Sequence, residues 1–237
     1  MFQPFKGFYW ILFILLFPIA VFSQASKYHY IPPLSVAGGS AADFEGQRMY
    51  LSTPSNAPVN YTIWPLPLNN ATKITGTIDK LSPTETLVNN TDYYVIPSGI
   101  QHNVFSQLFV SSENAGTVTS TKGYYIEANA PIYVSIRYNI VRQGSGFVSK
   151  GEAGLGKSFR TGGFTNGSPR DDNYLNFASV MAVEAGTTTV TFSDINNNAG
   201  DGYADMENIA EVYDGSGNIA DIEITLNQFE TFVIATR

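Results

Sequence analysis

The segment Gly151–Ser158, with the sequence GEAGLGKS, matches the phosphate-loop pattern G-x-x-x-x-G-K-[ST] at every specified position. Such a loop binds phosphates through its backbone N–H groups, and it requires a strand directly before it and a helix directly after it. The strand predicted at 131–141 ends well before the motif, because the glycine-rich run 143–146 interrupts it. Two adjacent glycines at 162–163 oppose a helix after the motif. The segment is therefore predicted to be a solvent-exposed loop that binds no nucleotide.

A second segment with the residue types for a metal site is DINNNAGDGYAD, at residues 194–205. Its oxygen-bearing side chains resemble the start of a calcium loop, because Ca²⁺ prefers about six to eight oxygen ligands. Ala199 stands where the EF-hand pattern has glycine, however, and an aspartate stands where that pattern has a bidentate glutamate. Asn and Asp also favour turns without a metal. Calcium and a plain hairpin loop both remain open, the plain loop being the expectation, and the candidate ligands are Asp194, Asn196, Asn198, Asp201 and Asp205.

Few residues have the chemistry of a catalytic group. The chain has no cysteine and two histidines, His29 and His102, and no G-x-S-x-G motif accompanies them. A Ser-His-Asp triad through His102 stays open, because triads are assembled in space. The simpler interpretation is a loop position for His102 and solvated acids elsewhere, so we predict no enzyme and no cofactor. The acids that could supply a pair of glycosidase carboxylates are Asp171, Asp172, Asp201 and Asp205.

The N-terminal residues predict an export signal. Lys6 precedes an uninterrupted apolar run at 8–22, and small or polar residues suited to a signal peptidase follow it. We predict a signal peptide over residues 1–23, with cleavage near Ser23 or Ala25. The alternative is an uncleaved membrane anchor, since the run is just short of the roughly 18 residues that suggest a spanning helix. Export places the mature chain in the secreted fraction or on a bacterial cell surface, with membrane contact only through the signal segment before cleavage.

Composition narrows the class of partner. The net charge is −7 and the isoelectric point is near 4.7, whereas nucleic-acid binders need clustered Lys and Arg. We therefore predict no nucleic-acid partner. The lack of cysteine excludes disulfides and thiolate metal sites, so the fold depends on core burial and strand pairing. Charged residues make up 14% of the chain, well under the roughly 25% of an average globular protein, and this favours an extracellular β protein.

The elements that position these residues are predicted to be strands. Residues 24–46 contain paired prolines and paired glycines and are predicted to be an extended lead-in, with the first strand at about 47–53. Runs rich in β-branched and aromatic residues then recur between turn signals, which indicates an all-β, antiparallel β-sandwich over 47–237. It is either one domain or two packed β subdomains, with at most one short helix at 203–212. Further strands are predicted at 59–64, 72–78, 93–96, 107–110, 122–127, 132–141, 177–183 and 187–192, before a hairpin of 220–226 with 231–235.

Two pairs of adjacent aromatic residues, Tyr93–Tyr94 and Tyr124–Tyr125, could stack on sugars. Adjacent residues of a strand point to opposite faces, so one member of each pair is predicted to lie in the core. Sequons at Asn60, Asn70 and Asn89 mark surface positions if the host glycosylates asparagine.

Three segments resemble the IgGFc-binding-type N-terminal domain of large secreted proteins of Bacteroidetes. They are YYIEANAPIYVSIRYN (124–139), GEAGLGKSFRTGGF (151–164), and TVTFSD (189–194) with IEITLNQFETFVIA (222–235). In that family a loop of the type A-L-G-x-x-F-x-x-G follows a strand, and a final hairpin has the type T-L-x-x-G-E-x-Y-V. Leu155–Phe159 and Thr225–Val233 are similar to these motifs, with Phe229 where glycine is usual.

The resemblance implies a non-enzymatic extracellular binding or adhesion module at the N-terminus of a larger secreted or cell-surface protein. It further implies export by type IX secretion, as in gliding-motility-associated proteins. The implied partners are an extracellular protein or glycan, or neighbouring domains of the same chain. The chain stops directly after a predicted strand, so we expect it to be truncated at its C-terminus. The alternative function is that of a secreted carbohydrate-binding or carbohydrate-active β-sandwich protein.

Overall fold

The computed structural model of the protein describes residues 24–36, 44–78, 91–95, 107–111, 114–140, 143–161, 176–193, 195 and 220–236. These residues form strands, a four-residue 3-10 turn and the loops between them, with no α-helix among them, which confirms the predicted all-β fold. None of them forms a helix with the length and apolar content that a membrane span requires. The predicted signal peptide and the predicted short helix at 203–212 lie outside these residues.

Most of the strands are short, and one, β8, spans 17 residues. The 3-10 turn, η2, covers Gly151–Gly154. The strands are β1 (Ser26–Ile31), β2 (Leu34–Val36), β3 (Phe44–Ser52), β4 (Val59–Pro65), β5 (Ile74–Ile78), β6 (Thr91–Val95), β7 (Phe109–Ser111), β8 (Tyr124–Ile140), β9 (Gln143–Val148), β10 (Asn176–Met181), β11 (Thr187–Phe192), β12 (Ile222–Asn227) and β13 (Thr231–Thr236).

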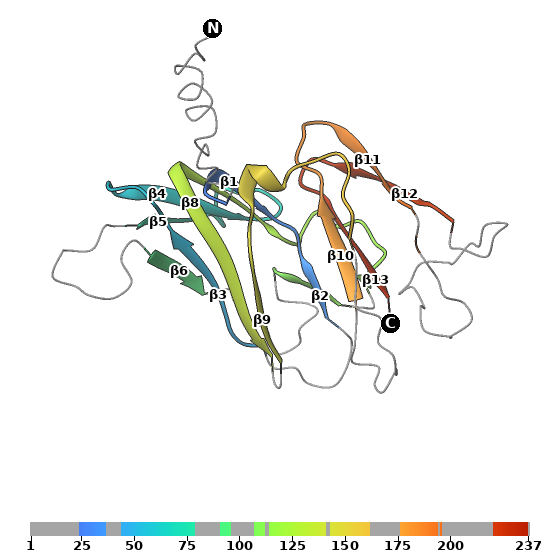
Figure 1. Cartoon of the computed structure of the whole chain (residues 1–237), viewed down its shortest axis with the longest axis horizontal. Helices are drawn as coiled ribbons and strands as arrows, with labels where there is room; N and C mark the ends of the chain where they lie inside the picture. Colours follow the sequence, from blue (N-terminus) through green and yellow to red (C-terminus); the bar gives the residue numbers. More distant parts are fainter. Residues whose placement is uncertain are drawn as a thin grey trace, which may run out of the picture.

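The long strand β8 organises a seven-stranded sheet (Figure 1). The order is β5-β4-β8-β3-β6, with β1 and β9 also paired to β8. The first part of β8 has β4 along one edge and β1 along the other. Its last part has β3 along one edge and β9 along the other. Ile126, Val134 and Ile136 are buried on one side of β8. This alternation explains why the segment forms a strand that turns one face toward the core.

The last four strands form a two-stranded antiparallel ribbon with a corner. β10 pairs with β13, and β11 pairs with β12. The two connections meet at the corner, where the Phe229 N–H donates to the Ala182 carbonyl at 2.7 Å. The hairpin predicted for 220–235 is therefore wrong. The turn between β12 and β13 lies where expected, but these two strands do not pair with each other. β12 pairs with β11 and β13 pairs with β10, so the turn forms the bend of the ribbon.

The N-terminal segment is more ordered than its prolines suggested. Residues 24–46 were expected to be a lead-in before a first strand at about 47, but β1, β2 and the beginning of β3 lie within them. His29 and Ile31 are buried in alternation, and β1 pairs with β8. β1 ends at Pro32 and Pro33, because proline has no backbone N–H to donate to a neighbouring strand. The residues before them still form a strand.

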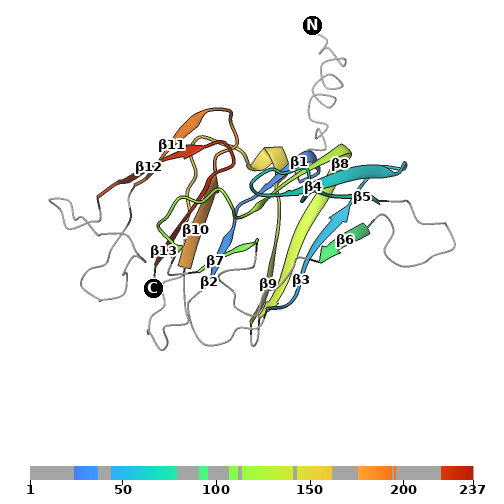
Figure 2. The same cartoon turned by 180° about the vertical axis from the view of Figure 1, so that it is seen from behind.

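Buried side chains form two clusters, and the strands lie in two parts of the molecule, as Figure 2 shows. The main sheet lies on one side of the molecule and the ribbon on the other, with β2 and β7 between them. The pairing of β2 with β7 is parallel, whereas the other strand pairings are antiparallel. Face-to-face sandwich packing stays a prediction. The larger cluster includes Ile31, Met49, Leu51, Ile63, Phe109, Tyr124, Ile126 and Val134, and the smaller one consists of Ala182, Leu226, Phe232 and Ile234.

Candidate binding face

One face of the main sheet carries aromatic and polar side chains across β5, β4, β8 and β1. On β4, Val59, Tyr61 and Ile63 are buried in the core, so the residues between them lie on the opposite side of the sheet. The same alternation holds along β5 and β8, and along β1 from Tyr28 onward. We call this surface the outer face, and its residues are Tyr28, Tyr30, Asn60, Thr62, Trp64, Lys73, Thr75, Thr77, Tyr125, Glu127 and Asn129.

Tyr125 is the centre of an aromatic group on the outer face. In the strand register it lies opposite Trp64 on β4 and opposite Tyr30 on β1. The Tyr125 ring centroid is 5.4 Å from that of Tyr30 and 6.5 Å from that of Tyr28. It is also 5.4 Å from Phe229, which reaches the sheet from the ribbon corner. We call Tyr28, Tyr30, Trp64, Tyr125 and Phe229 the aromatic cluster.

The aromatic pair Tyr124–Tyr125 divides as predicted. Tyr124 is fully buried in the larger core, and Tyr125 lies on the outer face. Adjacent side chains of a strand point to opposite sides, and this rule placed one of the two tyrosines inside. Which of them faces outward follows from the register of β8 with β1 and β4, and sequence alone does not give that register.

Phe229 has an unusual backbone conformation. Its φ is 64°, in the left-handed region, which costs a residue other than glycine roughly 1–2 kcal/mol. The turn around it is fixed by hydrogen bonds, in which the Asn227 N–H donates to Glu230 Oε2 at 2.7 Å and the Glu230 N–H donates to the Asn227 carbonyl at 2.9 Å. The ring held in this conformation contacts Tyr125, with the two centroids 5.4 Å apart.

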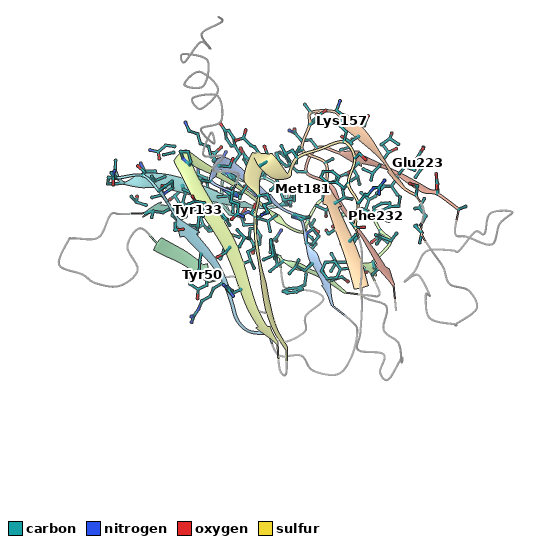
Figure 3. The ribbon with its side chains drawn as sticks, viewed as in Figure 1. Tyr50, Tyr133, Lys157, Met181, Glu223 and Phe232 are labelled. Atoms are coloured by element: carbon teal, nitrogen blue, oxygen red, sulfur yellow. The ribbon has the colours of Figure 1, made fainter. Side chains whose placement is uncertain are left out.

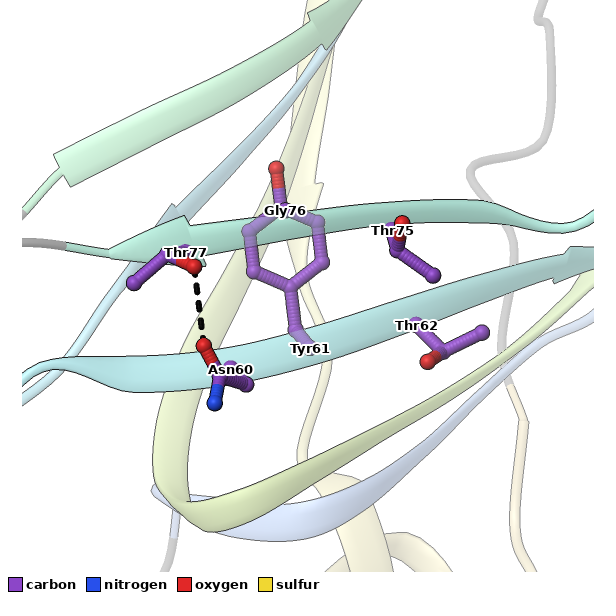
Figure 4. A pocket seen from close by; sticks show the side chains of 6 residues that line it. All are labelled: Asn60, Tyr61, Thr62, Thr75, Gly76 and Thr77. Carbon is purple, nitrogen blue, oxygen red and sulfur yellow. Dashed lines mark hydrogen bonds between the residues drawn. The ribbon is translucent and has the colours of Figure 1, made fainter.

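The other end of the outer face is polar and slightly hollow (Figure 4). A hollow of about 390 Å³ is lined by Asn60, Tyr61, Thr62, Thr75, Gly76 and Thr77. Thr77 Oγ1 donates to Asn60 Oδ1 at 2.8 Å, and the Asn60 N–H donates to Asn129 Oδ1 at 3.0 Å. The buried Tyr61 ring occupies the space that a side chain at Gly76 would need. The side chains of Asn60, Thr62, Thr75 and Thr77 give this part of the outer face its hydroxyl and amide groups.

The charges of the outer face lie at defined places. Lys73 Nζ lies 5.3 Å from the centroid of the Trp64 ring, a cation–π arrangement. Glu127 lies between Thr62 and Tyr28 in the strand register. Burial first, and the nearby Glu127 carboxylate second, raise the pKa of Tyr125 well above its ordinary value, and burial also raises the pKa of Tyr30. Both hydroxyl groups therefore stay neutral and can donate and accept hydrogen bonds at physiological pH.

The segment that matches the phosphate-loop pattern forms η2 and the exposed loop after it. Residues 152–161 are exposed, which confirms the predicted surface loop (Figure 3, Lys157). η2 has four residues, and extended backbone at Leu155 follows it where a phosphate loop needs a helix. Several of its N–H groups already have protein acceptors. The Gly151 N–H donates to Ser149 Oγ at 3.2 Å, and the Leu155 N–H donates to the Glu152 carbonyl at 3.1 Å.

We expect Lys157→Ala to change the free energy of unfolding by no more than about 0.5 kcal/mol, because the side chain is exposed. Urea denaturation of the variant and the wild type tests this. Isothermal titration with ATP and Mg²⁺ should give no heat of binding for either protein. Micromolar ATP affinity that disappears in the variant would show that the sequence match has functional meaning.

His29, whose burial the sequence did not predict, links η2 to the main sheet. His29 is fully buried, and its Nδ1 lies 2.9 Å from Ser149 Oγ. Its Nε2 lies 2.9 Å from the Ile132 carbonyl oxygen and 3.2 Å from that of Ser26. Two carbonyl acceptors require the proton on Nε2, so Nδ1 accepts from the Ser149 hydroxyl. Its alternation with Ile31 in the segment YHYI was the only sequence signal of burial.

This histidine is a structural group and not a catalytic one. A triad histidine needs a carboxylate on one ring nitrogen and an accessible hydroxyl nucleophile on the other. Here one ring nitrogen contacts backbone carbonyls, and the Ser149 hydroxyl is itself buried. Glu152 instead accepts a hydrogen bond from Ser26 Oγ at 2.8 Å. The group therefore ties η2 to β1.

The remaining residues predicted from sequence lie outside the described part of the chain. Within the described ranges, no group of three or more His, Asp or Glu side chains could hold a metal ion. Asn60 and Asn70 are exposed, as their sequons suggested. The residues outside comprise the calcium candidates Asp194, Asn196, Asn198, Asp201 and Asp205, the possible catalytic residues His102, Asp171 and Asp172, and the sequon at Asn89.

The chain matches no protein-family model, no curated protein and no solved structure.

Proposed function

We propose that the chain is a non-enzymatic extracellular binding module of a larger secreted or cell-surface protein, and that it binds its ligand through the outer face. The observation that carries this proposal is the aromatic cluster, in which the rings of Tyr28, Tyr30 and Phe229 gather around Tyr125. None of these rings belongs to either buried core cluster. The ligand is an extracellular protein or glycan.

Aromatic rings on a sheet surface favour binding for two physical reasons. Covering them removes apolar area from water, which stabilises a complex by roughly 25 cal/mol per Å². Each ring also has only two side-chain torsions, so little conformational entropy is lost when a partner immobilises it. Tyr28 is 39% exposed, so a partner can reach the edge of the cluster without any rearrangement.

The chemistry of the outer face favours binding over hydrolysis. Glycoside hydrolysis ordinarily uses two carboxyl groups on either side of the scissile bond. The outer face, as defined above, includes one carboxylate, that of Glu127. Its other polar groups are hydroxyls, amides and one lysine, which orient a ligand but do not transfer protons readily near neutral pH.

A binding screen with matched variants tests this function. The full chain is applied to a panel of immobilised extracellular proteins and to a glycan array, and the same glycans are screened for hydrolysis. We expect at least one ligand, and Tyr28→Ser should weaken its binding by about tenfold, since a stacked ring contributes about 0.5–1.5 kcal/mol. Phe177→Ala is the control, because Phe177 is 38% exposed on β10, away from the outer face.

Two outcomes would contradict the proposal. Binding that is equally strong in the Tyr28→Ser variant would separate the outer face from ligand recognition. Turnover of a glycan that is lost in Glu127→Gln would show an enzyme instead of a binding module.

A further inference from the structure

We infer that the outer face binds an uncharged oligosaccharide chain, which lies across the aromatic cluster, Glu127 and the hollow at Asn60 and Thr77. This inference rests on the proposed binding function and names the chemical class of the ligand. The surface offers what a pyranose needs, because such a ring has an apolar C–H side and a rim of hydroxyl groups. Flat aromatic faces pack against the apolar C–H side, and carboxylate, amide and hydroxyl groups form hydrogen bonds with the sugar hydroxyls.

The geometry of the rings leaves aromatic faces available. Tyr28 and Tyr125 are nearly parallel, at 9°, but their centroids are 6.5 Å apart. This is near the upper limit for stacked aromatic pairs, so the two faces overlap little. Tyr30 and Phe229 are tilted by 31° and 38° relative to Tyr125, with centroids 5.4 Å from it, whereas Tyr28 is exposed. A sugar ring can therefore lie against the Tyr28–Tyr125 pair.

Polar groups continue directly from the rings in the strand register. Glu127 is opposite Tyr28 on β1 and opposite Thr62 on β4, and Thr62 is opposite Thr75 on β5. One step further, Asn129 accepts from the Asn60 N–H, and Asn60 accepts from Thr77. A carboxylate accepts up to about four hydrogen bonds. The long Tyr125–Glu127 contact of 3.5 Å uses little of this capacity.

The charges favour an uncharged saccharide over an acidic one. Glu127 lies in the middle of the path, so a uronate there would meet a like charge. The cation of the face, Lys73, is engaged with the Trp64 ring at the edge. The chain as a whole carries a net charge of −7, which repels polyanions at longer range.

A variant at Phe229 separates an effect on binding from an effect on stability. Phe229→Gly has two opposing effects on stability. Loss of the ring contacts destabilises the fold, whereas glycine adopts the left-handed backbone conformation without strain. We expect the melting temperature to stay within about 4 °C of the wild type. Binding of the oligosaccharide should weaken by about tenfold, because the ring beside Tyr125 is lost.

The experiment uses the full chain in isothermal titration with cellohexaose, mannohexaose and xylohexaose, and with oligogalacturonate as the acidic comparison. We expect binding of at least one neutral hexasaccharide, weaker or absent binding of oligogalacturonate, and loss of affinity in Tyr28→Ser and Phe229→Gly. Phe177→Ala should bind as the wild type does.

The outcomes separate this inference from the proposed function. If none of the neutral sugars binds, but an extracellular protein binds and loses affinity in Tyr28→Ser, the oligosaccharide inference is wrong and the binding module stands. Preference for oligogalacturonate overturns the inference in the same way. If no ligand of either class depends on Tyr28 or Phe229, both proposals are overturned.

Discussion

His29→Ala is expected to lower the free energy of unfolding by about 3 kcal/mol, which is a large part of the roughly 5–15 kcal/mol that stabilises a typical domain. The ring is fully buried and contacts the Ser149 hydroxyl and the carbonyls of Ile132 and Ser26. Its removal leaves a cavity, and each buried polar group without a partner costs roughly 1–3 kcal/mol. Urea denaturation at pH 7.5 measures the change.

The same residue makes stability depend on pH. Burial lowers the pKa of His29 below its ordinary value of about 6.5, and this outweighs the opposite effects of the two carbonyls and of Glu152. Below pH 6.5 the unfolded chain therefore binds a proton that the folded chain resists. Stability is full above pH 6.5 and falls as the pH decreases from there, by at most about 1.4 kcal/mol per pH unit.

His29→Gln separates titration from packing, because glutamine keeps hydrogen-bonding groups but has no proton to gain. We expect a flatter dependence of stability on pH between about 5 and 6.5 in this variant than in the wild type. Carboxylates titrate mainly below this window, and they are common to both proteins. Parallel pH profiles for the two proteins would show that His29 is not the titrating group.

The strands were predictable wherever alternation was uninterrupted. The strand predicted at 59–64 corresponds to β4, and the one at 187–192 to β11. The predictions at 122–127 and 132–141 proved to be one strand, β8, because buried and outward residues continue to alternate through Pro131. The sequence pattern does not predict β1, because the two prolines that follow it are typical of loop structure.

Sequence alone predicted that one tyrosine of the pair at 124–125 lies outside the core, but it did not predict which aromatic rings surround it. The rule of opposite faces placed one tyrosine of Tyr124–Tyr125 inside, but the ring neighbours of Tyr125 come from β1 and from a turn about a hundred residues away. Such neighbours depend on pairing register and on the bend of the ribbon, and a single sequence encodes neither as a local pattern. Phe229 has a positive φ, a conformation that glycine adopts without strain, and no local sequence pattern predicts it for a phenylalanine.

Gly151→Ala, at the first glycine of the segment that matches the phosphate-loop pattern, is expected to lower the free energy of unfolding by about 2–5 kcal/mol. A methyl group there would overlap the Ser26 side chain and lie 3.0 Å from the backbone oxygen of Tyr28. The φ of 55° adds roughly 1–2 kcal/mol of backbone strain, and overpacking against a fixed strand adds about 1–3 kcal/mol.

Gly156→Ala, in the second glycine of the same motif, is the matched control. A methyl group there would meet only the end of the Phe159 ring, at 3.0 Å, and that side chain is 63% exposed and can move aside. We expect a change within about 0.5 kcal/mol, measured by urea denaturation. A phosphate loop would need both glycines for its ligand and would respond to ATP, whereas we expect only the glycine that contacts β1 to affect stability. Equal destabilisation by the two variants would show that the close contact of η2 with β1 does not determine the residue at Gly151.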